Sequence, residues 1–390
     1  MKKTFFLAAL LAVLACSCGK SPDPVIDPPQ EPVVDPVESD FIKGADISWA
    51  SEMEAGGRTF KKKDGTAAPL LDVLRDCGFN AIRLRVWVDP YKGWSGKDDV
   101  VAVAKKAKAA ALPVMIDFHY SDFFADPGRQ KIPAAWDGDA SDLAKMTAHV
   151  ADHTKEVLNA LKSAGVEVRW IQVGNETRNG MLSPLGDAVW KNDQIDLTKF
   201  VALYNAGYTA AKAVFPGAFV MPHLDNAYLS ASYGNPMWLG DFKAKGAKFD
   251  MIAFSHYPQY ESEMWIGGTK KTLSATEVNQ YALAYIKSAI STFGVPVMVA
   301  EVGVKSQANE ATAKSLLKSF LDEARKIDGC AGVFYWEPQV DGKWKPEIYG
   351  LPAELSKYTG TKQSSAWGAY DQGAFTTAGA PTSVLDVFAD

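Results

Sequence analysis

Short apolar segments alternate with longer amphipathic segments along the chain from Phe41 onward. The short segments are rich in β-branched and aromatic residues, and the longer ones place apolar residues at helical spacing. The predicted strands cover residues 42–47, 81–87, 113–118, 168–173, 218–222, 251–255, 296–300 and 331–335. The predicted helices cover residues 68–77, 98–111, 142–164, 197–214, 238–245, 275–292 and 311–327, with a short one at 383–388. Nearly continuous apolar strands between helices indicate a parallel sheet.

Eight strand–helix units close most naturally into a (β/α)8 barrel, and an open doubly wound sheet is the structural alternative. Glycine stands where four of the helices should end, at Gly78, Gly165, Gly294 and Gly329. No GxGxxG follows the first strand, which weighs against dinucleotide binding. A barrel needs about 250 residues. The surplus lies after the third, fourth, sixth and eighth strands, at 120–141, 177–196, 257–274 and 336–383. We predict a single domain with long loops at the carboxyl ends of its strands.

The N-terminus has the order of an export signal. Lys2 and Lys3 precede an apolar run over residues 4–15, which is too short to span a bilayer comfortably. Cys16 and Cys18 follow, as in the cleavage box of bacterial lipoproteins, although an ordinary signal peptide is the alternative. We predict a lipoprotein signal at 1–18, a Pro- and Asp-rich tether at 19–40 and a catalytic domain at 41–390. We expect a lipid-anchored protein of the bacterial envelope, at the outer-membrane surface, but the residues do not specify the membrane face or which cysteine is lipidated.

Composition excludes several other classes of protein. A net charge of −5 argues against a nucleic-acid partner, which normally requires a basic face. Cys77 and Cys330 are far apart in sequence, and we expect two buried thiols rather than a disulfide. His149 and His153 have the spacing of helical zinc ligands without the HExxH pattern, so we predict a solvated helix face and no metal site.

Polar and ionisable residues end most of the predicted strands. Burying a charge without a partner is costly, so these residues are not expected there for packing alone. They are Asp46, Arg83, Arg85, Asp117, His119, Asn175, Glu176, His223, His256, Tyr257, Glu301 and Trp336. In a barrel enzyme the active site lies at this end of the strands.

Glu176 and Glu301 form the pair that can perform chemistry, because they end strands on opposite sides of the barrel mouth. Two facing carboxyl groups are what glycoside hydrolysis requires, one as proton donor and one as nucleophile. The alternative is that each glutamate only favours the start of the following helix. A retaining enzyme would hold the two carboxyl groups about 5–5.5 Å apart, whereas about 9 Å would indicate inversion.

Other strand-end residues fit a sugar-binding cleft. Asn175 can bond to a sugar 2-hydroxyl, and Tyr257 can bond to the nucleophile. Arg83 and Arg85 point the same way along one strand, and one of them can brace Glu301; a salt bridge serving only the fold is the alternative. Three tryptophans are candidates for stacking on sugars or for ordinary packing, namely Trp87, Trp136 and Trp336.

Several motifs together resemble glycoside hydrolase family 53, the endo-β-1,4-galactanases. They are AIRLRVWVDP (81–90), DFHYSDFFADP (117–127), PAAW (133–136), WIQVGNET (170–177), SHYP (255–258), AE (300–301) and FYWEP (334–338). The resemblance extends over residues 41–390. It implies retention of configuration, with Glu176 as acid/base and Glu301 as nucleophile. It also implies cleft positions for His119, Asn175, Tyr257 and Trp336.

The resemblance implies a β-1,4-galactan substrate, galacto-oligosaccharide products and no cofactor. From their strand ends we add Asp46, Arg85, Trp87, Trp136, His223 and His256 to the predicted substrate-binding residues. Ser183 replaces an aromatic residue common in the family, so one sugar platform is expected to be missing. The loop after the eighth strand lacks a convincing version of the calcium cluster of some bacterial members, so no ion is predicted. A monomer suffices. Alternatives are a mannanase or xylanase of the same clan, and a non-catalytic glycan-binding lipoprotein.

Overall fold

The computed structural model describes residues 41–389, apart from 192–193, 227–236, 261–262, 267–268 and 361–370. The predicted signal and tether, with Cys16 and Cys18, lie outside the described residues. Residues 39–390 form one compact unit. Within the described part of the chain, no helix is both long and apolar enough to cross a membrane.

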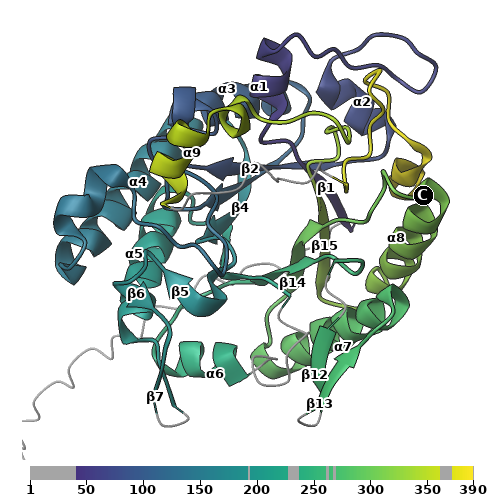
Figure 1. Ribbon diagram of the computed structural model, residues 1–390. Coiled ribbons are helices and arrows are strands. Elements are labelled where there is room, and N and C mark those ends of the chain that lie inside the picture. Colours follow the sequence, from purple (N-terminus) through teal and green to yellow (C-terminus); the bar gives the residue numbers. More distant parts are fainter. Residues whose placement is uncertain are drawn as a thin grey trace, which may run out of the picture. The chain divides into compact units, whose positions relative to one another are not determined.

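Nine parallel strands form one sheet, and their positions match the predicted strands to within two residues at nearly every boundary (Figure 1). They are β1 (Ile42–Asp46), β2 (Ala81–Val86), β3 (Val114–Phe118), β4 (Val168–Val173), β9 (Phe219–Met221), β10 (His223–Leu224), β11 (Ile252–His256), β14 (Val297–Val302) and β15 (Cys330–Trp336). Their order is β10-β11-β14-β15-β1-β2-β3-β4-β9.

The sheet closes into a barrel through Pro222. This proline separates β9, which pairs with β4, from β10, which pairs with β11. Proline has no N–H to donate, which interrupts the strand. Its carbonyl still accepts a hydrogen bond of 3.0 Å from the Ala253 amide on β11. The two short strands together therefore take the place of one barrel strand. The predicted (β/α)8 barrel is confirmed.

Helices surround the barrel in the predicted alternation (Figure 1). They are α1 (Ala50–Ala55), α2 (Leu70–Asp76), α3 (Lys97–Ala109), α4 (Leu143–Ser163), α5 (Thr198–Val214), α6 (Met237–Ala244), α7 (Ala275–Phe293), α8 (Glu310–Ala324), α9 (Pro352–Thr359) and the 3-10 helix η5 (Ser383–Phe388). Gly78, Gly165 and Gly294 have positive φ and stand at the ends of α2, α4 and α7 as predicted, whereas α8 already ends at Ala324, before Gly329. Of the helices, α1 and α9 were not predicted, since both lie in segments that were assigned to the connections after a strand.

The barrel interior is a separate apolar layer below the polar strand ends. It contains mainly methionine, alanine and aromatic side chains, namely Ile42, Ala81, Met115, Trp170, Met221, Met251, Ala253, Met298, Ala300 and Phe334. Gly44 on β1 belongs to the same face, and a Cβ at this position would lie 2.1 Å from the Phe334 ring. The second core lies between the strands and the helices and includes Cys77 and Cys330, which are both buried free thiols, as predicted.

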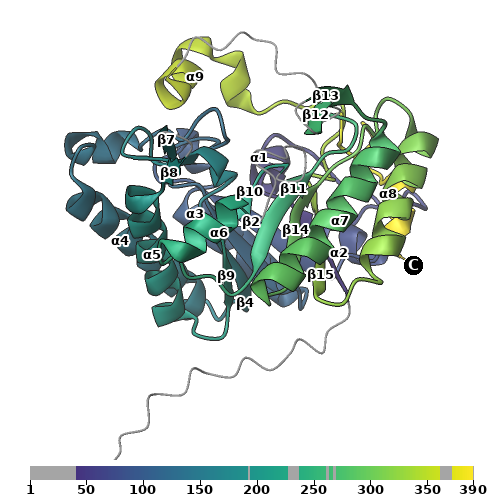
Figure 2. The same cartoon turned by 90° about the horizontal axis from the view of Figure 1, so that it is seen from below.

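The surplus sequence folds into small elements at the carboxyl ends of the strands. These are the 3-10 helix η2 (Ala134–Asp139) after β3, the hairpins β5–β6 (Gly180–Met181, Gly186–Asp187) and β7–β8 (Val189–Lys191, Gln194–Asp196) after β4, the hairpin β12–β13 (Glu263–Ile266, Thr269–Thr272) after β11, and η4 (Glu347–Gly350) with α9 after β15. Figure 2 shows α9 and the β12–β13 hairpin at the same end of the barrel.

Candidate active site

A cleft opens at the carboxyl ends of the strands. It consists of one cavity of about 240 Å³ and a neighbouring one of about 440 Å³, which share Glu176, Tyr257 and Trp336 in their walls. The predicted residues that line the first cavity are Asp46, Arg85, His119, Asn175, Glu176, Tyr257, Glu301 and Trp336. The two cavities therefore form one groove that runs past both predicted catalytic carboxyl groups.

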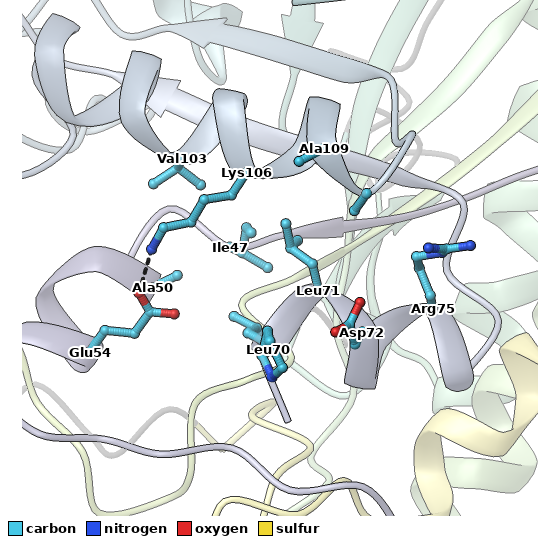
Figure 3. Close-up of a pocket in the computed structure, with 12 residues that line it drawn as sticks. Ile47, Ala50, Glu54, Leu70, Leu71, Asp72, Arg75, Val103, Lys106 and Ala109 are labelled. Atoms are coloured by element: carbon cyan, nitrogen blue, oxygen red, sulfur yellow. Dashed lines mark hydrogen bonds and ion pairs between the residues drawn. The ribbon is translucent and has the colours of Figure 1, made fainter. Parts of the chain in front are cut away.

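A different hollow of about 380 Å³ lies on the outer wall of the barrel between α1, α2 and α3 (Figure 3). Apolar side chains such as Leu70 and Val103 make up much of its lining. The charged residues at its rim include Glu54 and Lys106, which form an ion pair of 2.6 Å. Since its lining holds none of the strand-end residues, the hollow is separate from the cleft.

A β-bulge directs Glu301 into the cleft. Phe254 on β11 pairs with Val299 on β14, but the next residue, Ser255, pairs with Glu301, so Ala300 is an extra residue. Bulges of this kind change where side chains point and often occur beside active sites. Glu301 is buried, and its Oε1 lies 2.8 Å from Arg83 Nη2.

Arg83 on β2 is the centre of the polar network below the cleft. Its guanidinium contacts Asp46 at 2.7 Å, Asp117 at 2.8 Å and Glu301 at 2.8 Å. It also donates to Gln172 and Asn175, at 2.7 and 3.1 Å. The predicted bracing of Glu301 by an arginine thus comes from Arg83, whereas Arg85 contacts Glu337. A guanidinium with this many anionic partners is suited to holding an ionised carboxylate in a fixed position.

Glu176 lies where the chain leaves β4. Gly174 has φ +87° and Glu176 has φ +48°, both in the left-handed region. A non-glycine residue in this conformation is uncommon, and such conformations cluster at functional sites. The turn leaves the Glu176 side chain partly exposed in the cleft, with its Oε1 2.7 Å from Ser255 Oγ.

Different surroundings separate the two carboxyl groups electrostatically. Burial, followed by the negative charge of Glu301, raises the pKa of Glu176 well above its ordinary value. Burial also raises the pKa of Glu301, but Arg83 and the Tyr257 hydroxyl, which donates to Glu301 at 2.6 Å, oppose that rise. Of the pair, Glu176 therefore keeps the proton and Glu301 is the anion.

Two predicted substrate contacts are already bound to protein groups. Asp46 accepts hydrogen bonds from the Ser48 amide and hydroxyl, at 3.0 and 2.6 Å, besides its contact with Arg83. His119 accepts from the Ala125 amide through Nδ1 at 2.9 Å, and its Nε2 lies 2.9 Å from Asp117. Both residues line the cavity, but these contacts assign them mainly to positioning their neighbours.

Asn175 and His223 lie behind Glu176. His223 is fully buried, and its Nδ1 lies 2.8 Å from Asn175 Oδ1. Asn175 donates one amide hydrogen to the Ala125 carbonyl at 2.8 Å and lines the cavity. Asn175 therefore faces the cleft, while His223 supports it from below.

The aromatic wall of the cleft centres on Trp336, which is half-buried and lines both cavities. Its ring lies edge-on to Phe124 and Tyr257, with centroids 6.3 and 6.4 Å apart. Arg85 lies beneath this wall, with Cζ 4.0 Å from the centroid of the Trp49 ring. Trp336 thus offers a partly exposed aromatic surface, as a sugar platform requires.

The structure does not place Trp87 and Trp136 in the cleft, which corrects their prediction as sugar platforms. Trp87 is 2% exposed and stacks on Phe123 with centroids 5.1 Å apart. Trp136 is 7% exposed and stacks on His149 at 5.2 Å, with His153 edge-on at 6.0 Å. The helix face predicted to be solvated is only partly exposed at these two histidines, because Trp136 packs against both rings.

His256 is also outside the cleft. Alternation along β11 places Ser255 on the inner face and Phe254 and His256 on the outer face. The His256 ring is fully buried against Phe320 of α8 and lies 2.7 Å from Asn279 of α7. The prediction overlooked this alternation, so His256 belongs to the core.

Several residues of the groove were not predicted. They are Phe124, Asp126, Arg129, Asp225, Asn226, Ser255, Tyr260 and Gln372. The inward-facing parity of Ser255 within its strand was a usable signal, as it was for Arg83. The others lie in loops, whose path the strand pattern does not specify.

Within the described residues, no group of three or more His, Cys, Asp or Glu side chains is arranged to hold a metal ion. A guanidinium from the segment between α1 and α2 contacts the loop after β15. Arg58 contacts the Asp341 carboxylate and donates to the carbonyls of Thr377 at 2.9 Å and Thr376 at 3.0 Å. This contact ties the loop to the C-terminal segment.

Comparisons with known proteins agree with this geometry. The Glycosyl hydrolase family 53 profile matches residues 42–388. The chain is 32% identical over 318 residues to a probable arabinogalactan endo-beta-1,4-galactanase A of Neosartorya fischeri. The match covers 76% of this chain and 83% of the relative. It is 28% identical over 368 residues to the endo-beta-1,4-galactanase of Bacillus subtilis, with 86% and 77% covered.

Solved structures lead to the same family. A fungal beta-1,4-galactanase superposes with a TM-score of 0.70 at 27% identity, covering 89% of this chain and 98% of that structure. The family 53 catalytic domain of Ignisphaera aggregans superposes with a TM-score of 0.71 at 26% identity, covering 91% and 98%. From the profile match, the relatives and the barrel with its two carboxyl groups, this chain belongs to Glycosyl hydrolase family 53.

Proposed function

We propose that this protein is a retaining endo-β-1,4-galactanase that cleaves galactan and the galactan side chains of arabinogalactan. The observation that carries the proposal is the pair of carboxyl groups in one groove, Glu176 with its raised pKa and Glu301 bound to Arg83. The substrate rests on the galactanase relatives, which match over most of the chain. A groove made of two neighbouring cavities has room for several sugars, which suits a polysaccharide and cleavage within its chain.

In the first step, the Glu301 carboxylate attacks the anomeric carbon while Glu176 gives its proton to the leaving glycosidic oxygen. Arg83 and Tyr257 orient the attacking carboxylate. Asn175 has a second amide hydrogen for the sugar 2-hydroxyl. The product is a galactosyl ester of Glu301 and a shortened galactan chain.

In the second step, the ionised Glu176 removes a proton from a water molecule, and this water attacks the anomeric carbon of the ester. Glu301 leaves as a carboxylate, and Glu176 is protonated again. Two displacements at the same carbon restore the original configuration. The partly exposed ring of Trp336 supplies an apolar face for the sugar during both steps.

Hydrolysis of linear β-1,4-galactan tests this function. The purified full chain is incubated with the polysaccharide beside its Glu301→Gln variant, and the products are sized over time. We expect short galacto-oligosaccharides from the wild type and none from the variant. Absence of cleavage by a folded wild type would refute the galactanase assignment. Parallel assays on β-mannan and xylan would then identify a related hydrolase, and binding without cleavage would identify a glycan-binding protein.

We further propose that the protein works as a monomer held in the cell envelope by a lipid on Cys16 or Cys18. The sequence order of basic residues, apolar run and cysteine supports this location. Labelling of cells with a radioactive fatty acid, for the wild type and the Cys16→Ala and Cys18→Ala variants, identifies the lipidated residue. Label that persists in both single variants and in the double variant would overturn the anchor.

A further inference from the structure

A chain of buried hydrogen bonds extends from the candidate acid away from the cleft. Ser255 Oγ lies 2.7 Å from Glu176 Oε1 and 3.0 Å from His223 Nε2. His223 Nδ1 lies 2.8 Å from Asn175 Oδ1. Ser255 and His223 are fully buried, and Asn175 is 5% exposed. In this series of hydrogen bonds, the atom that carries each proton depends on whether the neighbouring group donates or accepts.

The orientation of the Asn175 amide determines which atoms donate and which accept in this series of hydrogen bonds. Its Nδ2 donates to the Ala125 carbonyl at 2.8 Å, and its Oδ1 accepts from Arg83 at 3.1 Å. Oδ1 is therefore an acceptor, and His223 Nδ1 must carry a hydrogen to bond with it. The Glu176 amide N–H also points at Nδ1, at 3.3 Å, but the contact with the Asn175 oxygen is shorter, at 2.8 Å, and decides the tautomer.

His223 carries only this one proton. Burial, together with the positive charge of Arg83, lowers the pKa of His223 well below its ordinary value. Its Nε2 is therefore an acceptor, and the Ser255 hydroxyl donates to it. A hydroxyl has one hydrogen, so Ser255 Oγ can then only accept a hydrogen bond from Glu176.

We propose that Asn175, His223 and Ser255 form a positioning relay that holds the proton on Glu176 in the resting enzyme. When Glu176 is ionised, Ser255 has to turn its hydrogen toward the carboxylate, which leaves Nε2 without a donor. Leaving a buried polar atom unpaired is unfavourable, so the relay disfavours the ionised acid. The inference rests on the proposed function of Glu176 as acid/base.

The relay neither supplies nor removes a proton in the reaction. A half-turn of the carboxyl group presents the Glu176 proton to the glycosidic oxygen, and water returns a proton in the second step. Ser255 and His223 begin and end each cycle with the same hydrogens. Their effect is on the pH range over which Glu176 is a proton donor.

Other groups influence the same proton and have to be separated from the relay. Glu301, Tyr257, Asp225 and Asp126 face Glu176, with Asp225 paired to Arg178, while Arg83, Asp117 and His119 face His223. These groups do not depend on the Ser255 hydroxyl. A change confined to that hydroxyl therefore isolates the relay.

The sign of one pKa change tests the proposal. An ordinary hydroxyl that donates to a carboxylate lowers its pKa, so its loss raises the value. In the relay Ser255 accepts from the protonated acid, and Ser255→Ala should lower the Glu176 pKa by about one pH unit. Ser255→Thr keeps the hydroxyl and should restore the wild-type value. His223→Phe frees the serine hydrogen and should also lower the Glu176 pKa.

The titration is followed by NMR on full-length protein labelled with ¹³C at the glutamate carboxyl carbon, with the Glu176 signal identified by Glu176→Gln. Ser306→Ala is the matched control, because Ser306 is a buried hydroxyl bonded to Tyr335 instead. A Glu176 pKa that rises or stays constant in Ser255→Ala would overturn the relay, as would no change in His223→Phe. Since no substrate is used, this outcome is read separately from any failure to cleave galactan.

Discussion

Arg83 Nη2 lies 2.8 Å from Glu301 Oε1, whereas Glu176 contacts the neutral hydroxyl of Ser255. This difference separates two residues of the same type in one groove. A carboxylate held by a guanidinium stays ionised and can attack, while a carboxyl group beside a neutral partner and a nearby anion keeps its proton. The roles of nucleophile and acid therefore follow from the contacts of each carboxyl group.

We predict that Arg83→Lys lowers kcat on galactan by about a hundredfold to a thousandfold, the usual effect of removing one donor to a reacting anion. Arg83 opposes protonation of Glu301. The acidic limb of the kcat/KM profile should therefore move to higher pH in the variant. Tyr257→Phe removes a single hydrogen bond of 2.6 Å to Glu301 and should move the same limb in the same direction by less. An unmoved acidic limb in both variants would contradict the assignment of Glu301.

Glu176→Gln should abolish proton donation but leave the nucleophile in place. On galactan, whose leaving group needs a proton, we predict a loss of about 10²–10⁴-fold or more. On a dinitrophenyl β-galactoside of two or three sugars the first step needs no acid, so the ester of Glu301 should accumulate as an initial burst. Glu301→Gln is the control and should show no burst. Equal losses on both substrates would mean that Glu176 is not the acid.

The strands and their polar ends were predictable from the sequence, because a buried parallel strand is an apolar run and a charge at its end is conspicuous. Asp46, Asn175 and Glu176 were recognised in this way, and the structure gathers them with Glu301 at one cavity. Alternation would also have placed Ser255 inside the barrel and His256 outside it, so that error was avoidable.

Other features depend on tertiary structure that the strand pattern does not contain. The bulge at Ala300 appears only when β14 is set against β11, and it determines the direction of Glu301. The choice of Arg83 over Arg85 as partner of Glu301 depends on the depth of each side chain in the barrel. Phe124 reaches the cleft through a loop whose course has no repeating pattern.

Buried neutral histidines should make the protein sensitive to acid. Burial lowers the pKa of His256 from 6.5 to about 4, although its bond with Asn279 opposes the change. An unfolded chain would bind this proton at higher pH, so the stabilisation is present above about pH 6.5 and is lost as the pH falls toward 4. The full loss corresponds to about 3 kcal/mol for this residue.

Urea unfolding of the wild type and His256→Gln at several values between about pH 7 and pH 4.5 measures this effect. Glutamine keeps a donor for Asn279 but does not titrate, so the free energy of unfolding should fall less steeply in the variant. The slope should not vanish, because His223 is also buried and has a lowered pKa. Parallel curves for the two proteins would contradict the prediction.

The buried pair beneath the aromatic wall should be strongly coupled. Arg85 Nη1 lies 2.6 Å from Glu337 Oε1, and both side chains are at most 1% exposed. Glu337→Leu leaves a buried guanidinium without its carboxylate, and such a break costs about 3–5 kcal/mol. Arg85→Met combined with Glu337→Leu removes both charges and should recover a large part of this stability.

A double-mutant cycle by urea unfolding gives the coupling between Arg85 and Glu337. The exposed ion pair between Lys357 and Glu354, at 2.7 Å, is the matched control, and its cycle should show almost no coupling. Because Arg85 packs on Trp49 and Phe124 as well, the double variant should be stable yet bind galactan less tightly, with KM affected more than kcat. Additive losses in the cycle would show instead that each side chain acts through its packing and not through the pair.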